Sequence, residues 1–163
     1  MQNIQNSLSA SYAAFADGDT DLAIKSLVTS FSHRSNNNWT PAEKLSTYTF
    51  LAWLYFDQRR LTKALDCLWK VLHLQEQIFG INSPQTANTV FNLAEICRQL
   101  GLPEQAAALY ERLLSVAILS LGIEHPCCEL IMKRRQETEG LTAPSDNRAS
   151  SSSVHQTQSC LAE

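Results

Sequence analysis

The chain has 163 residues, of which 44% are hydrophobic and 18% are charged, and its formal net charge is −3 at pH 7. This composition fits one globular domain with a buried core, and the slight excess of acid gives no reason to expect nucleic-acid binding. No apolar run reaches the roughly 18 residues of a membrane-spanning helix, and the N-terminal stretch lacks the pattern of a secretory signal. We therefore expect a cytoplasmic protein without membrane insertion, whose five cysteines are reduced thiols.

The N-terminal stretch, about residues 3–34, predicts two helices joined by a turn at Asp17-Gly18-Asp19. Small or apolar residues mark the inner faces of both helices: Ala10, Ser11, Ala14, Ala23 and Leu27. Because small side chains bury little area, we expect this hairpin to be the most weakly packed part of the domain. If the chain forms a homodimer, we expect the contact to use this N-terminal repeat.

Residues 41–80 predict a second hairpin with bulkier side chains. Thr40 and Glu43 have the Ser/Thr-x-x-Glu spacing of a capping box, and Pro41 occupies the first helical position. The apolar faces of the two helices carry Tyr48, Leu51, Ala52 and Tyr55, and then Leu61, Ala64, Leu68 and Val71. This periodicity is typical of two amphipathic helices packed against each other.

Residues 84–122 repeat the pattern. The matching apolar positions are Val90, Leu93, Ala94 and Cys97, followed by Ala106, Leu109, Tyr110, Leu113 and Ala117. Gly101 and Pro103 separate the two helices. FGINSP at residues 79–84 returns as LGIEHP at 121–126, so that both the glycine and the proline recur after 42 residues. A fixed period of this length indicates stacked helical repeats.

Residues 126–139 predict one more helix, and no return helix follows it. Its apolar residues come first and its cationic residues come next: Leu130, Ile131, Lys133, Arg134 and Arg135. A half-repeat with a charged outer face would close the apolar end of a stacked array. Residues 140–163 are polar, Ser-rich and aperiodic, and we expect them to be a disordered tail behind a repeat domain that spans residues 1–139.

The motif Tyr48-x2-Leu51-Ala52-x2-Tyr55, followed by Ala64-x3-Leu68, resembles the tetratricopeptide signature. Val90-x2-Leu93-Ala94-x2-Cys97 with Ala106-x3-Tyr110 repeats it, with weaker matches at Val90 and Cys97. The common period is about 34 residues. The longer spacing and the LGIEHP motif are similar to the kinesin-light-chain type of repeat. The resemblance covers roughly residues 3–139 and implies an all-α fold, a right-handed α-solenoid of three helical hairpins plus a C-terminal capping helix.

In this family the first helix of each hairpin lines a concave groove that binds partners. The resemblance therefore implies a groove containing Thr49, Trp53 and Phe56, which lie at i, i+4 and i+7 on the first helix of the middle repeat. The repeat spacing adds the following residues: Tyr12, Phe15, Asn88, Phe91, Asn92, Glu95, Arg98 and Lys133. Such a groove is aromatic at one end and mixed polar at the other, which suits a peptide with apolar anchors. Trp53 and Phe91 fit packing and partner contact equally well.

We therefore expect a non-enzymatic adaptor that binds a peptide segment of another protein and needs no cofactor. Related domains that hold the acidic tails of heat-shock chaperones use a clamp of Lys, Arg and Asn. The corresponding residues are Leu8, Tyr12, Phe50, Asn88 and Asn92. No cation remains to pair with a carboxylate, which disfavours that ligand. A dedicated chaperone for a secreted or assembly-bound client is an alternative, although the repeats of such chaperones have the shorter period.

His125, Cys127 and Cys128 form the one cluster of soft metal ligands in the sequence. Tetrahedral zinc needs a fourth ligand and usually a wider spacing, so a metal- or redox-active protein that uses this cluster is a second alternative. The interpretation that we favour is one exposed and one buried thiol at Cys127 and Cys128, with Cys67 and Cys97 in the core. The other histidines are scattered, and no phosphate loop or nucleophile motif indicates an enzyme.

Overall fold

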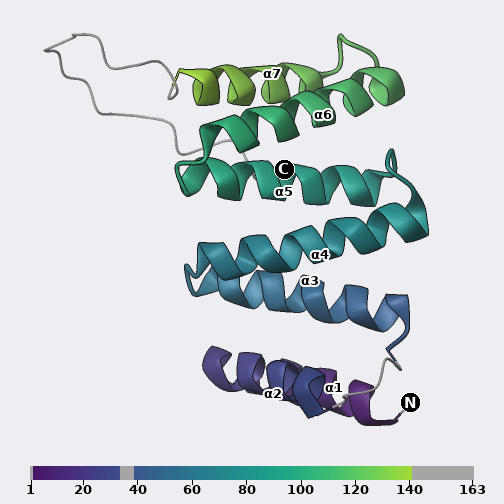
Figure 1. Ribbon diagram of the computed structural model, residues 1–163, viewed down its shortest axis with the longest axis vertical. Helices are drawn as coiled ribbons and strands as arrows, with labels where there is room; N and C mark the ends of the chain where they lie inside the picture. The colour runs from purple at the N-terminus through teal and green to yellow at the C-terminus, as the bar shows by residue number, and fades with distance from the viewer. Residues whose placement is uncertain (1, 34–38, 141–163) are drawn as a thin grey trace, which may run out of the picture.

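The computed structural model describes residues 2–33 and 39–140, and within these ranges the fold is all-α (Figure 1). The helices are α1 (Gln2–Ala16), α2 (Thr20–His33), α3 (Pro41–Asp57), α4 (Leu61–Phe79), α5 (Pro84–Gln99), α6 (Pro103–Leu121) and α7 (Pro126–Glu139). They stack in chain order along the long axis, from the α1–α2 hairpin at one end to α7 at the other. The predicted tail, apart from Gly140, lies outside the described residues.

Side-chain caps explain where the later hairpins begin. The Thr40 hydroxyl accepts a hydrogen bond from the Glu43 amide at 3.2 Å, and the Glu43 carboxylate accepts one from the Thr40 amide at 2.8 Å. The predicted capping box is therefore confirmed. Ser83 caps α5 in a similar way, and at α7 the His125 ring accepts a hydrogen bond from the Cys127 amide. In all three helices proline follows the cap, where its missing amide hydrogen breaks no helical hydrogen bond.

The recurring Gly-x-x-x-Pro motif joins one hairpin to the next. Gly80 and Gly122 end α4 and α6 with φ/ψ angles of 88°/162° and 85°/155°. Only glycine adopts this region of backbone space without substantial strain. The two loops lie on the same edge of the array, opposite the turns inside the hairpins (Figure 1).

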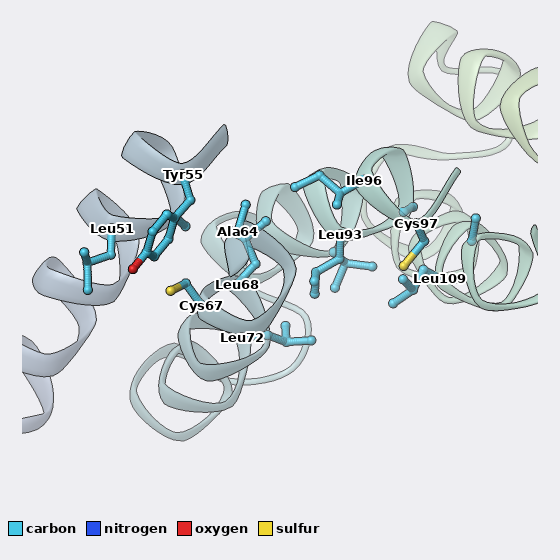
Figure 2. Close-up of a cluster of buried hydrophobic side chains, with 14 of the residues drawn as sticks. Leu51, Tyr55, Ala64, Cys67, Leu68, Leu72, Leu93, Ile96, Cys97 and Leu109 are labelled. Carbon is cyan, nitrogen blue, oxygen red and sulfur yellow. The ribbon is translucent and has the colours of Figure 1, made fainter. Parts of the chain in front are cut away.

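The core runs continuously through the second and third hairpins. Figure 2 shows Leu51 and Tyr55 of α3 facing Cys67 and Leu68 of α4, and further along Leu93 and Cys97 of α5 near Leu109 of α6. Alanines occupy the small positions of the repeat motif, and all are buried: Ala52, Ala64, Ala94 and Ala106. The inner faces that the apolar periodicity predicts in these two hairpins are therefore confirmed. In the first hairpin Ser11 and Ala14 are buried as expected, but Ala10 is exposed.

The first hairpin joins the rest through aromatic rings. α2 contacts α3 much less extensively than α4 contacts α5 or α6 contacts α7. Where α2 and α3 do meet, Phe31 stacks on Trp39 with ring centroids 4.4 Å apart and on Tyr48 with centroids 5.1 Å apart. Within the first hairpin, however, α1 contacts α2 about as extensively as α5 contacts α6, so the weak packing expected inside this hairpin is not found and the sparse contacts lie at its junction with α3. None of the described helices is both long enough and apolar enough to cross a membrane.

Candidate functional site

Four aromatic side chains form a patch on the first helices of the first two hairpins, which we call the aromatic patch: Tyr12, Phe15, Phe50 and Trp53. The Tyr12 ring stacks on Phe50 at 4.1 Å between centroids, and the Phe15 ring meets Trp53 edge to face at 4.6 Å. Tyr12 and Trp53 nevertheless remain 52% and 46% exposed. The patch therefore packs α1 on α3 and still presents two large rings to solvent.

Thr49 and Phe56 lie on the same helix as Trp53, one turn before it and one turn after it. Phe56 is 40% exposed, which extends the apolar surface of the aromatic patch. The exposed Thr49 hydroxyl donates a hydrogen bond to the Leu45 carbonyl oxygen at 2.8 Å. Its hydrogen is thus already used inside α3, which leaves the oxygen lone pairs for a ligand.

A hollow opens between α5, α6 and α7, with a volume of about 340 Å³. We call it the α5–α7 pocket. Most of its lining is apolar and comes from Ala87, Phe91, Leu113, Val116, Leu130 and Ile131. Asn88 and Cys127 also line it, so that two of the predicted groove residues, Asn88 and Phe91, share one cavity. Asn92, one turn after Asn88, and Lys133 on α7 are exposed.

The other half of α5 carries an ionic network centred on Glu95, whose side chain is 18% exposed. Tyr110 of α6 donates a hydrogen bond to Glu95 Oε1 at 2.6 Å, and Arg98 donates to Oε2 at 2.9 Å. Arg134 of α7 lies 3.6 Å from the same carboxylate. One carboxylate therefore links three helices.

The pKa values follow from this geometry. Burial alone would raise the pKa of Glu95, but the hydrogen bonds from Tyr110 and Arg98 and the charges of Arg98 and Arg134 outweigh it and hold the pKa below its ordinary value. Burial, and then the hydrogen bond to Glu95, raises the pKa of Tyr110. The carboxylate stays ionised and the phenol stays protonated at neutral pH, so Glu95 remains a charged acceptor for the Tyr110 hydroxyl and a partner for the two arginines.

The structure thus places seven of the eleven predicted groove residues in three local groups. Tyr12, Phe15 and Trp53 share the aromatic patch, and Asn88 and Phe91 share the α5–α7 pocket. Glu95 and Arg98 pair with each other on α5, and Glu95 also contacts Tyr110 of α6 and Arg134 of α7.

The two adjacent cysteines of α7 lie in different environments. Cys128 is fully buried, with its Sγ 3.3 Å from the Gly122 carbonyl oxygen, whereas Cys127 is exposed. Cys67 and Cys97 are buried. These four expectations are confirmed. Over residues 2–33 and 39–140, no group of three or more His, Cys, Asp and Glu side chains is placed to hold a metal ion.

Several residues of the site did not emerge from the sequence. Phe50 belongs to the aromatic patch, and Arg134 completes the ionic network. One signal could have revealed that network: the repeat spacing places Glu95 where Trp53 stands and Tyr110 where Leu68 stands. An acid and a hydroxyl that replace two apolar residues of one hairpin indicate a hydrogen-bonded pair.

The family model described as tetratricopeptide repeat matches residues 43–118, from α3 to α6. Residues 43–118 are thus similar to tetratricopeptide repeats. No curated protein matches the sequence. A crystal structure from Podosopora anserina, described as a kinesin light chain with nearly identical TPR-like repeats, has a TM-score of 0.61 and 16% identity, and the match covers 85% of this chain and 66% of that one. A second structure with the same description has a TM-score of 0.60, 16% identity and the same coverage.

BtubC (BKLC) from P. vanneervenii has a TM-score of 0.51 and 16% identity, and the match covers 86% of this chain and 70% of that one. The chain thus spans slightly less than two thirds of the two Podosopora structures. At this identity the likeness concerns the fold, which is that of kinesin-light-chain-type repeats, as the resemblance implied. Tetratricopeptide repeats are protein-interaction modules, and their stacked helices form extended binding surfaces.

Proposed function

We propose that this protein is a non-enzymatic adaptor that holds a segment of a partner protein along the first helices of its repeats. An apolar side chain of that segment enters the α5–α7 pocket. The pocket is the observation that carries the proposal, because a hollow of about 340 Å³ with an almost wholly apolar lining suits a hydrophobic anchor residue. Asn88 at its wall supplies a polar group that can bind the backbone of the segment.

The aromatic patch supports the proposal as a second contact surface. Exposed rings such as Tyr12 and Trp53 bury large area at small entropic cost, and here their stacking on Phe50 and Phe15 already fixes them. The ionic network acts on the pocket from the other end of α5, since it ties together the three helices that form the pocket walls. A wall that is rigid before binding loses less entropy when the ligand arrives.

The test is a comparative capture of partners from native cell extract with the full chain and four variants as baits. Leu130→Glu places a charge in the α5–α7 pocket, and its matched control is Leu119→Glu, because Leu119 is 81% exposed and lies outside the pocket. Trp53→Glu alters the aromatic patch, and Trp69→Glu on α4 is its control, since Trp69 is similarly exposed at 42%. Circular dichroism confirms that each bait is folded.

We expect wild type and both controls to retain the same discrete partner, Leu130→Glu to lose it, and Trp53→Glu to bind it more weakly. Leu130 is 48% exposed in the free protein, and the anchor residue of the partner would cover it. Covering a charged side chain in an apolar contact typically costs more than about 2 kcal/mol, so the loss should exceed about ten-fold in affinity. If folded Leu130→Glu retains every partner that wild type retains, the pocket is not the binding site and the proposal is wrong.

A further inference from the structure

The α5–α7 pocket has a cysteine at its wall. Cys127 lines the pocket and is exposed, whereas the other three cysteines within the described ranges, Cys67, Cys97 and Cys128, are buried. A thiol reagent or a second thiol that reaches the described part of the protein therefore meets Cys127 first. The pocket thus combines two chemical features, an apolar cavity and an accessible thiol beside it.

The sequence after α7 contains a matching pair of residues. Residues 141–163 are dominated by polar and small side chains, and their largest apolar residues are Leu141, Val154 and Leu161. The last of these directly follows Cys160, the fifth cysteine of the chain. The dipeptide Cys160-Leu161 therefore offers one apolar side chain and one thiol on adjacent residues, which are the two groups that the pocket can receive.

We propose that residues 154–163, which we call the C-terminal segment, dock in the α5–α7 pocket, with Leu161 among the apolar side chains and Cys160 next to Cys127. The docked segment occupies the cavity that the proposed function assigns to a partner's anchor residue. The docking itself does not depend on the proposed function. Only its consequence, that the segment competes with the partner for the pocket, rests on the proposed function.

The length of the connection fits this arrangement. Cys127 and Gly140 are 13 residues apart on α7, which corresponds to about 20 Å at the helical rise of 1.5 Å per residue. Cys160 comes 20 residues after Gly140, and a generic flexible linker of 20 residues has a root-mean-square span of about 25 Å. A linker whose span matches the distance between the two sites gives the highest effective concentration of one for the other.

Docking makes a specific covalent step available. With a low-molecular-weight disulfide such as oxidised glutathione as the oxidant, the thiolate of one cysteine attacks a glutathione sulfur, and one reduced glutathione leaves. The thiolate of the other cysteine then attacks the mixed disulfide, which forms the Cys127–Cys160 bond and releases a second reduced glutathione. Two protein thiols are oxidised and one glutathione disulfide is reduced, so no further reactant is needed. The bond would lock the C-terminal segment in the pocket.

The experiment measures the effective concentration of the two thiols in the full chain, without any partner. The protein is equilibrated in buffers with set ratios of reduced to oxidised glutathione, quenched with acid and alkylated, and the Cys127–Cys160 linkage is quantified by mass spectrometry. Leu161→Asp keeps the linker and both thiols but removes the apolar anchor. Leu130→Asp alters the pocket, and Leu119→Asp is its control.

We expect the wild-type effective concentration to exceed that of Leu161→Asp and Leu130→Asp about ten-fold or more, because burying a leucine is worth at least that factor. Leu119→Asp should match wild type. Equal values in wild type and Leu161→Asp would overturn the proposal, since a tethered but undocked segment gives the same value for both. A linkage to Cys128, or one between two chains that grows with protein concentration, would also overturn it. Because Leu161 lies outside the repeats, this variant tests the docking even if Leu130→Asp unfolds. Either result leaves the capture test of the proposed function unaffected.

Discussion

The two ends of the array are joined to its centre by different physical means. At the N-terminal junction, rings stack across α1, α2 and α3, and few other contacts exist. At the C-terminal junction, one partly buried carboxylate of α5 accepts a hydrogen bond from Tyr110 of α6 and forms an ion pair with Arg134 of α7, and the helix contacts are extensive. A repeat array is stabilised mainly by contacts between neighbours, so each junction sets how easily its end opens. We infer that the first hairpin can open while α5, α6 and α7 stay folded.

The most severe test of this difference is Phe50→Ala. The Phe50 side chain is buried and meets the rings of Tyr12, Phe15 and Trp53, so its removal leaves a cavity and should cost about 3 kcal/mol or more. Hydrogen exchange should show the amides of α1 and α2 losing protection, while those of α6 and α7 keep theirs. Trp69→Ala, an exposed control on α4, should change neither. Uniform loss of protection in all helices would contradict independent opening of the first hairpin.

A smaller effect is expected from Glu95→Gln, together with a change in pH dependence. The folded pKa of Glu95 lies below the ordinary value of 4.5. Its ionised form therefore stabilises the fold above pH 4.5, and that stabilisation is lost as pH falls through the folded pKa. Urea unfolding between about pH 5 and pH 3 should show a shallower fall for Glu95→Gln than for wild type, with a loss of about 1–3 kcal/mol at pH 7.

Glu111→Gln is the control for this titration, because Glu111 pairs with Arg135 at an exposed position. Its stability curve should run close to that of wild type, since screened surface pairs contribute little. If the free energy of unfolding falls equally with pH for wild type and Glu95→Gln, protonation of Glu95 is not the cause of the lower stability in acid.

The smallest expected difference concerns two ion pairs, one between the second and third hairpins and one at the first junction. Arg112 of α6 binds Glu76 of α4, and both side chains are about two thirds covered, whereas Arg60 and Asp21 at the first junction are largely exposed. Arg112→Met should lower the free energy of unfolding by about 0.5–1 kcal/mol, and Arg60→Met by less than about 0.5 kcal/mol. Thermal unfolding at low and high salt would separate them. A larger loss of stability for Arg60→Met than for Arg112→Met would show that burial does not determine which of the two ion pairs contributes more.

The apolar periodicity and the positions of glycine, proline and the capping residues predict the helices well, because helix capping and apolar spacing are local properties of the chain. The capping box at Thr40 and the buried alanines such as Ala64 follow directly from them. The grouping of the groove residues could not be predicted in the same way. Whether Phe91 lines a pocket depends on Leu130 and Val116, which are distant in sequence, and whether Glu95 is available depends on Tyr110 and Arg134.

The glycines that end α4 and α6 also bear on how far such sequences can diverge. A Cβ atom added at Gly80 or Gly122 would meet no atom within 4 Å, so glycine is required there for its backbone angles and not for space. In each of these two loops, one glycine with such backbone angles and a following proline direct the chain from one hairpin to the next helix. Exposed residues outside these loops can change without altering this path of the chain. This accounts for a common architecture between chains that share only 16% of their residues.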